Sequence, residues 1–396
     1  MTPKSIAIFT HKVDLQDGQG RVNFELVRAL LTQGHHVTVV AEFCSHEIAE
    51  HPNARFVQMR DHPLPTQFLR NLYYASKAGR WLRKHRQEFD LIQANGFVMW
   101  EPADVVAVHF VHGAWLRSPY FPFHWSTFSP YAWYQRVLTI LNARFEKRCF
   151  EQARLLIAVS SHTRDEVASL GVPREKITVV YNGVDTEEFQ PGPAERAHFG
   201  LPESVTMALF VGDLRTTRKN LDSVMKALVS VPELHIAVAG DATDSPFPAL
   251  AADLGVSDRV HFIGKTREID RLMRSTDFFV FPSRYEAHPL VLMEGLAAGL
   301  PLIVSSNFGA GDYVGGGGIV FGDSEDLSKL TAAMTMLATD SELRRSMSRS
   351  ARQVALAFQW GRTVDGYVAV YFRFFDGTAR SARSSRPNLN RQDKIL

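Results

Sequence analysis

The 396-residue chain has few cysteines, little net charge and no long apolar run. Cys44 and Cys149 are its only cysteines, and two thiols cannot build a disulfide scaffold or a four-thiolate zinc site. No segment approaches the ~20 consecutive apolar residues that a membrane-spanning helix needs. The apolar stretch near the N-terminus is too short for a signal peptide and is expected to form a strand. We therefore expect a cytoplasmic protein, and not a secreted, fibrous or integral-membrane one.

The charge balance gives no general attraction to nucleic acid. The chain carries 44 Lys and Arg against 42 Asp and Glu, a net charge of +2, so any anion binding must be local. Its apolar share of 45% is too high for general disorder. Because single cores stop growing at roughly 250–300 residues, two domains are expected.

Short β-rich runs alternate with helical stretches through the first half of the chain. The expected strands are residues 5–9, 37–41, 90–93, 105–108, 155–159 and 177–180. Between the first two, residues 23–33 place apolar side chains at helical spacing, and Gly34 is a suitable helix end. Such a strand–helix–strand unit predicts a parallel sheet.

A stretch rich in glycine and proline then separates this series from a second one. The second series of expected strands is 207–211, 234–239, 260–263, 278–281 and 301–304. The pattern predicts an α/β protein of two doubly wound domains facing a cleft, with ligands at the carboxyl ends of the strands. The expected divisions are a first domain at 1–185, a linker at 186–202, a second domain at 203–358, a helix at 359–376 and a basic, disordered tail at 377–396.

The strongest local signal for chemistry lies in residues 281–301. A strand ends near Phe281 and a helix begins near Pro289, which puts Glu286 in the connecting loop and Glu294 inside the helix. Free amides of the first helical turn attract phosphate, whereas carboxylates suit hydroxyl groups. A nucleotide sugar combines both chemistries. The alternative is that both glutamates are ordinary acids of a helix start and a helix surface.

The two glutamates, followed by Gly-Leu-Ala-Ala-Gly-Leu-Pro, resemble the signature of the family 4 glycosyltransferases, retaining enzymes of the GT-B architecture. Further segments resemble that family in the same order along residues 5–372. They are Asp17-Gly-Gln-Gly, Ala158-Val-Ser-Ser-His-Thr, Asn182-Gly-Val-Asp185, Phe210-Val-Gly-Asp-Leu, Arg218-Lys-Asn-Leu, Ala239-Gly-Asp and Phe262-Ile-Gly. The resemblance implies two Rossmann-like domains and a C-terminal helix that crosses back to the first domain.

The same resemblance implies roles for residues of the second domain. Glu286 would contact the donor sugar and Glu294 the ribose. The diphosphate would be held by the backbone around His288, Leu290 and Val291. Lys219 would stabilise the leaving diphosphate, where negative charge develops in the transition state. Without this context, Lys219 would be read as a solvated lysine at a helix start.

One departure from the family pattern concerns the residue after Gly212. The family commonly has arginine there, and this chain has Asp213. Arg215 is the expected substitute cation, and Arg218 is the alternative. If neither replaces it, the protein would be a weakened or inactive enzyme.

Two features of the first domain are expected at the cleft. Gly18 and Gly20 bracket the loop between the first strand and the first helix, where they would allow a close approach to the donor, although a plain turn would also use them. His109 directly follows the strand 105–108, and the resemblance implies a place for it near the donor sugar and acceptor. His112 competes for this role, and either histidine could be purely structural.

No metal or cofactor is expected. The chain has no Asp-x-Asp triad and no Cys/His cluster with zinc spacing, so lysine, arginine and helix amides would meet the phosphate charge. The aromatic segment 115–133 lies where the family builds its acceptor side. Its rings could rest on a membrane interface, with attraction from the basic tail, or fill a local core. The helix after Phe358 places Trp360, Tyr367 and Tyr371 on one face, a structural pattern.

Together with the resemblance, which alone implies retention of configuration and a role in bacterial surface glycan or glycolipid assembly, these observations predict a hexosyltransferase that uses a nucleotide-diphosphate sugar and a carbohydrate or lipid-linked acceptor. Two alternatives share the fold: a nucleotide-sugar epimerase and a catalytically silent nucleotide-sugar binding protein. A dinucleotide-dependent oxidoreductase fits poorly, because the first loop has Asn23 where Gly-x-Gly-x-x-Gly needs its third glycine.

Overall fold

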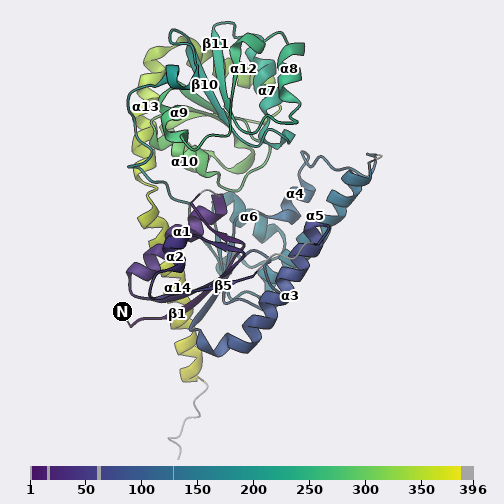
Figure 1. The fold of residues 1–396 in the computed structure, drawn as a ribbon, viewed down its shortest axis with the longest axis vertical. Helices are drawn as coiled ribbons and strands as arrows, with labels where there is room; N and C mark the ends of the chain where they lie inside the picture. Colours follow the sequence, from purple (N-terminus) through teal and green to yellow (C-terminus); the bar gives the residue numbers. More distant parts are fainter. Residues whose placement is uncertain (1, 16–17, 60–63, 128, 385–396) are drawn as a thin grey trace, which may run out of the picture.

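The computed structural model describes residues 2–15, 18–59, 64–127 and 129–384, which form two α/β domains joined end to end (Figure 1). The first contains a seven-stranded parallel sheet in the order β5-β3-β1-β6-β7-β8-β9. Its strands are β1 (Ser5–Phe9), β3 (His36–Ala41), β5 (Ala54–Gln58), β6 (Leu91–Asn95), β7 (Val105–Val108), β8 (Leu155–Ala158) and β9 (Ile177–Val179). Its helices are α1 (Gly18–Thr32), α2 (His46–Ala49), α3 (Gln67–His85), α4 (His112–Arg117), α5 (Pro130–Gln152) and α6 (Ser161–Ser169), and β2 (Lys12–Val13) pairs with β4 (Phe43–Cys44).

The second domain contains a six-stranded parallel sheet in the order β12-β11-β10-β13-β14-β15. Its strands are β10 (Thr206–Val211), β11 (Leu234–Ala239), β12 (Val260–Gly264), β13 (Phe278–Phe281), β14 (Leu302–Ser305) and β15 (Gly318–Phe321). Its helices are α7 (Leu221–Leu228), α8 (Phe247–Asp253), α9 (Ile269–Arg274), α10 (Leu290–Ala297), α11 (Gly311–Val314), α12 (Leu327–Thr339) and α13 (Ser341–Leu356).

Both sheets are covered on both faces, as the continuous apolar strands require. In β1, Ile6 and Ile8 pack into one core, and Ala7 and Phe9 into another on the opposite face. Strand β10 divides its side chains in the same way between the two cores of the second domain. Because side chains alternate along a strand, this division follows from the period of two. The predicted doubly wound architecture is confirmed.

The last helix, α14 (Trp360–Ser384), returns from the second domain to the first, where it lies beside the sheet (Figure 1). Tyr367 and Tyr371 are buried in the core that also holds Ile6 and Ile8. The crossover helix expected from the sequence is therefore present. It extends to Ser384, so the expected start of a disordered tail at residue 377 is wrong; residues 385–396 lie outside the described residues.

The chain crosses between the domains twice at one place. The amide of Val184 donates to the carbonyl of Phe358 over 2.8 Å, which joins the outgoing linker to the returning segment. A Cβ atom on Gly183 would lie only 2.7 Å from the Cα of Trp360, so a larger residue there would push the two crossings apart.

Among the described helices, none combines the length and apolar character needed to span a bilayer.

Candidate active site

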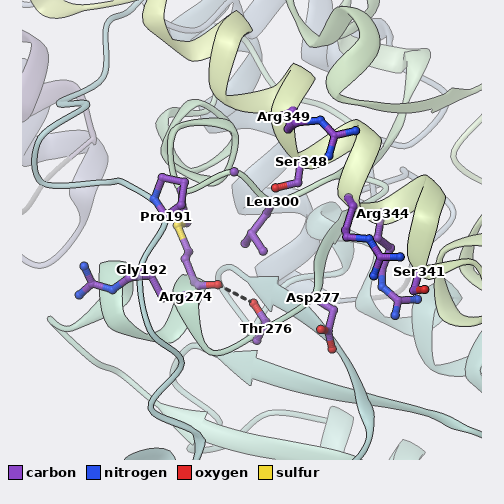
Figure 2. A pocket seen from close by; sticks show the side chains of 14 residues that line it. Pro191, Gly192, Arg274, Thr276, Asp277, Leu300, Ser341, Arg344, Ser348 and Arg349 are labelled. Carbon is purple, nitrogen blue, oxygen red and sulfur yellow. Dashed lines mark hydrogen bonds between the residues drawn. The ribbon is translucent and has the colours of Figure 1, made fainter.

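A cleft of about 1200 Å³ separates the two domains at the carboxyl ends of their strands. Most of the residues predicted from the sequence line it together. They are Gly18, His109, Arg218, Lys219, Glu286, His288, Leu290, Val291 and Glu294. Gly20 and Arg215 are not among the lining residues. A second cavity, in the second domain (Figure 2), shares no lining residue with this cleft.

The predicted catalytic lysine and the first glutamate form an ion pair in the cleft. Lys219 Nζ lies 2.6 Å from Glu286 Oε1, and Arg218 Nη1 lies 2.9 Å from the same oxygen. Ser283 Oγ is a third partner, at 3.0 Å. Glu286 is only 7% exposed; burial opposes its charged form, but Lys219 and Arg218 hold its pKa below the usual value. Two cations therefore converge on one buried carboxylate at the wall of the cleft.

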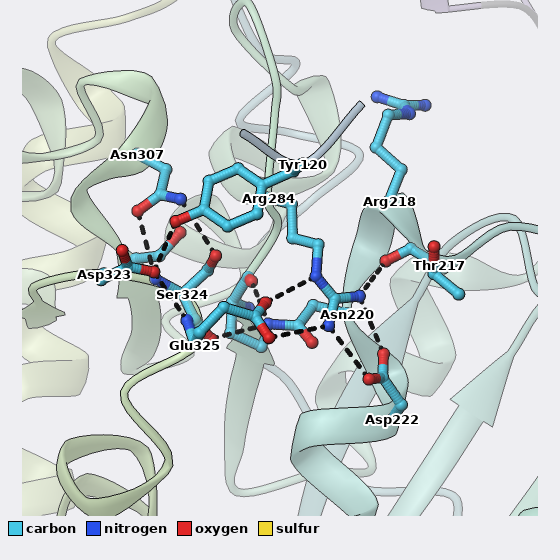
Figure 3. Close-up of polar contacts among 12 residues, drawn as sticks. Tyr120, Thr217, Arg218, Asn220, Asp222, Arg284, Asn307, Asp323, Ser324 and Glu325 are labelled. Atoms are coloured by element: carbon cyan, nitrogen blue, oxygen red, sulfur yellow. Dashed lines mark hydrogen bonds and ion pairs between the residues drawn. The ribbon is translucent and has the colours of Figure 1, made fainter. Parts of the chain in front are cut away.

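The two segments that carry this cluster are fixed to each other by Arg284 (Figure 3). Its guanidinium bonds both carboxylate oxygens of Asp222, at 2.9 and 3.0 Å, and Glu325 at 2.6 Å. Its amide donates to the carbonyl of Arg218 over 2.9 Å. Bidentate pairs of this kind are rigid and strong. Arg284 thus sets the separation of Arg218 from Glu286 without lining the cleft itself.

Asn220 positions the lysine from the other side. It adopts a left-handed backbone conformation, with φ of 64°, which asparagine tolerates better than most residues. Its buried side-chain amide donates to the carbonyls of Pro282 and Ser324, at 3.0 and 2.8 Å. Asn220 thereby ends the single 3₁₀ turn that carries Lys219 and directs the chain into α7.

The start of α10 presents its backbone amides to the cleft. Pro289 is the N-cap residue, with the extended ψ of 123°, and Leu290 and Val291 begin the helix. Their N–H groups belong to the first turn, where no intrahelical acceptor is available. The predicted helix start is therefore correct to one residue, and the amides are suitably placed to bind an anion.

His288, just before this turn, contributes through its backbone. Its side chain is 5% exposed and lies against the rings of Tyr181 and Tyr313. Burial lowers the pKa of His288 to about 3, so the ring is neutral. Its carbonyl accepts a hydrogen bond of 3.0 Å from Asn182, which lies just before the linker, so this contact joins the loop to the first domain.

Glu294 has a different environment from Glu286. It lies on the cleft side of α10, with no ion-pair partner in the described part of the chain. Burial, reinforced by Glu188 and opposed by Arg21, raises the pKa of Glu294 to about 7. The two glutamates of the motif are therefore chemically distinct: one is a paired anion, and the other is a carboxyl group close to its titration point.

The two candidate histidines, His109 and His112, also have different surroundings. His109 follows β7 and lines the cleft. His112 begins α4, where Glu146 of α5 binds both its amide, at 2.8 Å, and its ring Nδ1, at 3.1 Å. Glu146 is buried, so this contact fixes α4 against α5. Of the two histidines, His109 lines the cleft and His112 does not.

The glycine and arginine expectations need correction. Helix α1 begins at Gly18, five residues before the predicted start, so Gly18 and Gly20 lie in its first turn and not in a loop. The apolar periodicity starts only at Val22, and therefore gave no signal for this first turn. Arg215, the preferred substitute cation, does not line the cleft: its Nε pairs with Asp213 at 3.0 Å and the side chain is exposed, whereas Arg218 lines the cleft.

The aromatic segment divides into two parts. Phe121 is buried, and the ring of Trp115 packs against it and against Tyr285 of the second domain. Trp125 and Tyr131 are 54% and 63% exposed. The inner rings therefore fill a core between the domains, and the outer rings face the surroundings.

A hydrogen bond that the sequence did not indicate also crosses from this segment. Tyr120 Oη donates to Asp323 Oδ1 over 2.5 Å and so joins the first domain to the second (Figure 3).

Among the described residues, no three His, Cys, Asp or Glu side chains are grouped to hold a metal ion.

Two family models match almost the whole two-domain region. Residues 16–188 match Glycosyltransferase Family 4, and residues 193–354 match Glycosyl transferases group 1. The chain belongs to the family 4 glycosyltransferases. The division between the two matches falls in the linker, at the place where the fold divides.

Known proteins agree with this family and with its GT-B fold. The chain is 30% identical over 269 residues to D-inositol 3-phosphate glycosyltransferase of Mycolicibacterium smegmatis. The aligned region covers 64% of this chain and 60% of that protein. It is 32% identical over 236 residues to the Mycobacterium tuberculosis protein of the same name, 56% of this chain and 49% of that protein. The match thus spans about half to three fifths of these curated relatives.

Solved structures of low identity share the whole fold. WaaG, a glycosyltransferase involved in lipopolysaccharide biosynthesis, has a TM-score of 0.75 at 21% identity, with 92% of this chain and 99% of that chain covered. HepE of Anabaena, in complex with UDP-glucose, has a TM-score of 0.69 at 18% identity, with 93% and 99% covered. This family 4 glycosyltransferase therefore has the GT-B architecture that its sequence predicted.

Proposed function

We propose that this family 4 glycosyltransferase transfers a hexose from a nucleotide-diphosphate sugar to an acceptor hydroxyl, with retention of configuration and without a metal ion. The observation that carries the proposal is the convergence of Lys219 and Arg218 on Glu286, beside the amides that begin α10. Cations and amides suit the diphosphate, and the carboxylate suits the sugar hydroxyls. Pairing with Arg215 also compensates the charge of Asp213, which supports an active enzyme.

The reaction follows from this arrangement. The bond between the anomeric carbon and the phosphate oxygen breaks, and Lys219, Arg218 and the α10 amides stabilise the departing charge. The acceptor oxygen bonds to the anomeric carbon on the face that the leaving group vacates, and its proton passes to the departing phosphate oxygen. His109 lies on the opposite wall, beside the sugar. Closure of the two domains would exclude water and so prevent hydrolysis.

The acceptor side is proposed to be the first-domain wall of the cleft. Its cation Arg21 is paired with the buried Glu25 at 2.9 Å and approaches Glu188 at 3.4 Å. The exposed Trp125 and Tyr131, together with Arg136, are suited to a membrane interface that supplies a lipid-linked acceptor. A role in bacterial surface glycan or glycolipid assembly agrees with this acceptor class.

The first test is a thermal-shift panel of UDP, GDP, ADP and their sugar conjugates, with and without EDTA. A ligand that binds only the folded state stabilises it by ~2.7 kcal/mol at a hundredfold excess over Kd. We expect a shift with one nucleotide family that EDTA does not reduce, followed by release of nucleoside diphosphate when acceptor is added. Binding without release under any acceptor would favour a silent binding protein, and conversion of the sugar without acceptor would favour an epimerase.

Replacement of Glu294 should change the stability of the free protein and its affinity for the nucleotide sugar in opposite directions. Since its folded pKa is raised to about 7 by burial, its ionisation destabilises the fold as the pH rises from the ordinary glutamate value of about 4.3 through 7. Glu294→Gln should therefore raise the Tm of the free protein at pH 8 and leave it nearly unchanged at pH 4. The same change should weaken nucleotide-sugar binding about tenfold, because a carboxylate that accepts ribose hydroxyls is lost.

Calorimetric melting and binding isotherms at both pH values check this prediction. Glu187→Gln, an exposed acid in the linker region outside the cleft, is the matched control. Unchanged donor affinity in Glu294→Gln would remove Glu294 from the ribose site.

A further inference from the structure

The second cavity, of about 480 Å³, lies beside the linker between the domains. The linker residues Pro191 and Gly192 form one side of it, and Arg344, Ser348 and Arg349 of α13 form the opposite side (Figure 2). The turn that follows α10 closes the remaining wall. The cavity is within the range of small-molecule sites, roughly 300–1,000 Å³.

Two of the cations at this cavity lack a carboxylate partner. Arg344 donates to the carbonyls of Leu337 and Ala338, which leaves its charge uncompensated. Arg349 is exposed and has no ion-pair or hydrogen-bond partner within the described residues. Both arginines line the cavity, so α13 contributes two uncompensated positive charges to its wall.

The other charged residues at the cavity are compensated. Arg274 pairs with Asp270 at 2.7 Å, and Arg345 pairs with Glu342. The acid Asp277 is bound by Arg196 at 2.8 Å and by a backbone amide at 2.7 Å, so its negative charge does not cancel Arg344 or Arg349. The net field in the cavity favours an anion.

The same helix already holds the linker one turn further along. Arg352 donates to the carbonyls of Thr186 and Phe189 in the linker, at 2.9 and 2.8 Å. It also donates to the carbonyl of Ala297 at the end of α10, at 2.8 Å. A ligand in the cavity would therefore touch three elements that are connected to one another: the linker, α13 and the helix that begins at the donor site.

We propose that this cavity binds a small phosphate ester, with the phosphate at the α13 wall that Arg344 and Arg349 supply. The planar guanidinium matches phosphate geometry, and the hydroxyls of Ser341 and Ser348 supply further donors at the rim. The remaining surface, which includes Leu300 and Pro191, suits the less polar body of the ester. This site is separate from the cleft and does not depend on the proposed transfer reaction.

The test is calorimetric titration of the whole protein with glucose 6-phosphate, inorganic phosphate and free glucose. We expect the ester to bind more tightly than inorganic phosphate, and glucose not to bind. Arg349→Ala should weaken ester binding at least tenfold, because a charge-assisted contact is lost, without loss of Tm, since Arg349 is exposed and unpartnered. Lys329→Ala, an exposed cation on α12 with the same charge change, should bind the ester like the wild type.

Three results would overturn the proposal. One is that neither phosphate probe binds; another is that Arg349→Ala and Lys329→Ala bind the ester equally well. The third is that binding persists in Arg349→Ala and disappears in Lys219→Ala, which would place the ester in the cleft. Tighter binding of inorganic phosphate than of the ester would restrict the site to a simple anion and contradict the ester assignment.

Discussion

A Lys219→Ala variant should retain nucleotide-sugar affinity within a few-fold of the wild type and lose about 10²–10³-fold in kcat. The ammonium group lies 2.6 Å from Glu286 Oε1 and 4.8 Å from the centre of the Phe281 ring, so it is held away from water. In the ground state Arg218 and the α10 amides remain to bind the diphosphate. The additional charge that develops on the leaving oxygen needs a cation already held in place, and we propose that Lys219 has that role.

Single-turnover rates and equilibrium binding of the nucleotide sugar, measured on the same preparations, separate these two effects. Lys147→Ala is the control, since this lysine is an exposed partner of Glu151 on α5. Equal losses of affinity and turnover would mean that Lys219 only binds the donor. A full loss of turnover with a retained melting transition would exclude misfolding as the cause.

The sequence predicted the buried strands of the fold better than the partly exposed ones. Central strands such as β1 and β7 are continuous apolar runs, and their predicted bounds match the structure. The edge strands β5 and β15 were not predicted, because each is only partly buried and one begins within a run of glycines. Periodicity reports burial, so these two strands gave a weak signal, whereas the edge strands β9 and β12 each begin with a buried residue and were predicted.

The candidate site shows a similar limit. The motif containing Glu286 and Glu294 lies in one continuous segment, so sequence spacing was sufficient to place both in one cleft. Arg284 was missed, although it lies inside the motif, because its partners Asp222 and Glu325 are far from it in sequence. Asn220 was missed as a positioning residue because its left-handed conformation and its two carbonyl acceptors exist only in the folded chain.

The choice between Arg215 and Arg218 required the structure for a related reason. Both residues lie in the same loop, and sequence distance favours neither. Asp213 captures Arg215 two residues away through a local contact, which leaves Arg218 to meet Glu286. Asp213, which departs from the family pattern, is thus paired with the nearby Arg215. The arginine at the cleft is Arg218, three residues after the one that was expected there.

Glu286→Gln should lower both stability and turnover, and the comparison with Lys219 identifies the reason. Removing one partner of a buried ion pair leaves the other charge uncompensated, with losses of about 3 kcal/mol or more. Because the pKa of Glu286 is held low by Lys219 and Arg218, this loss should be complete at pH 7 and should shrink as the pH falls through the folded pKa. We expect kcat to fall about 10²–10³-fold, since the contact with the sugar hydroxyls is lost as well.

The double variant Glu286→Gln with Lys219→Met tests whether the pair acts as a unit. If the stability loss arises from an unpaired lysine, the double variant should be more stable than Glu286→Gln alone, with a coupling free energy of about 1–3 kcal/mol. Its turnover should remain as low as that of either single variant, because the charge needed at the leaving group is absent. Denaturant unfolding at pH 7 measures the first quantity and single-turnover rates the second. Additive stability losses would mean that the 2.6 Å contact contributes little, and that Glu286 and Lys219 act on the donor independently.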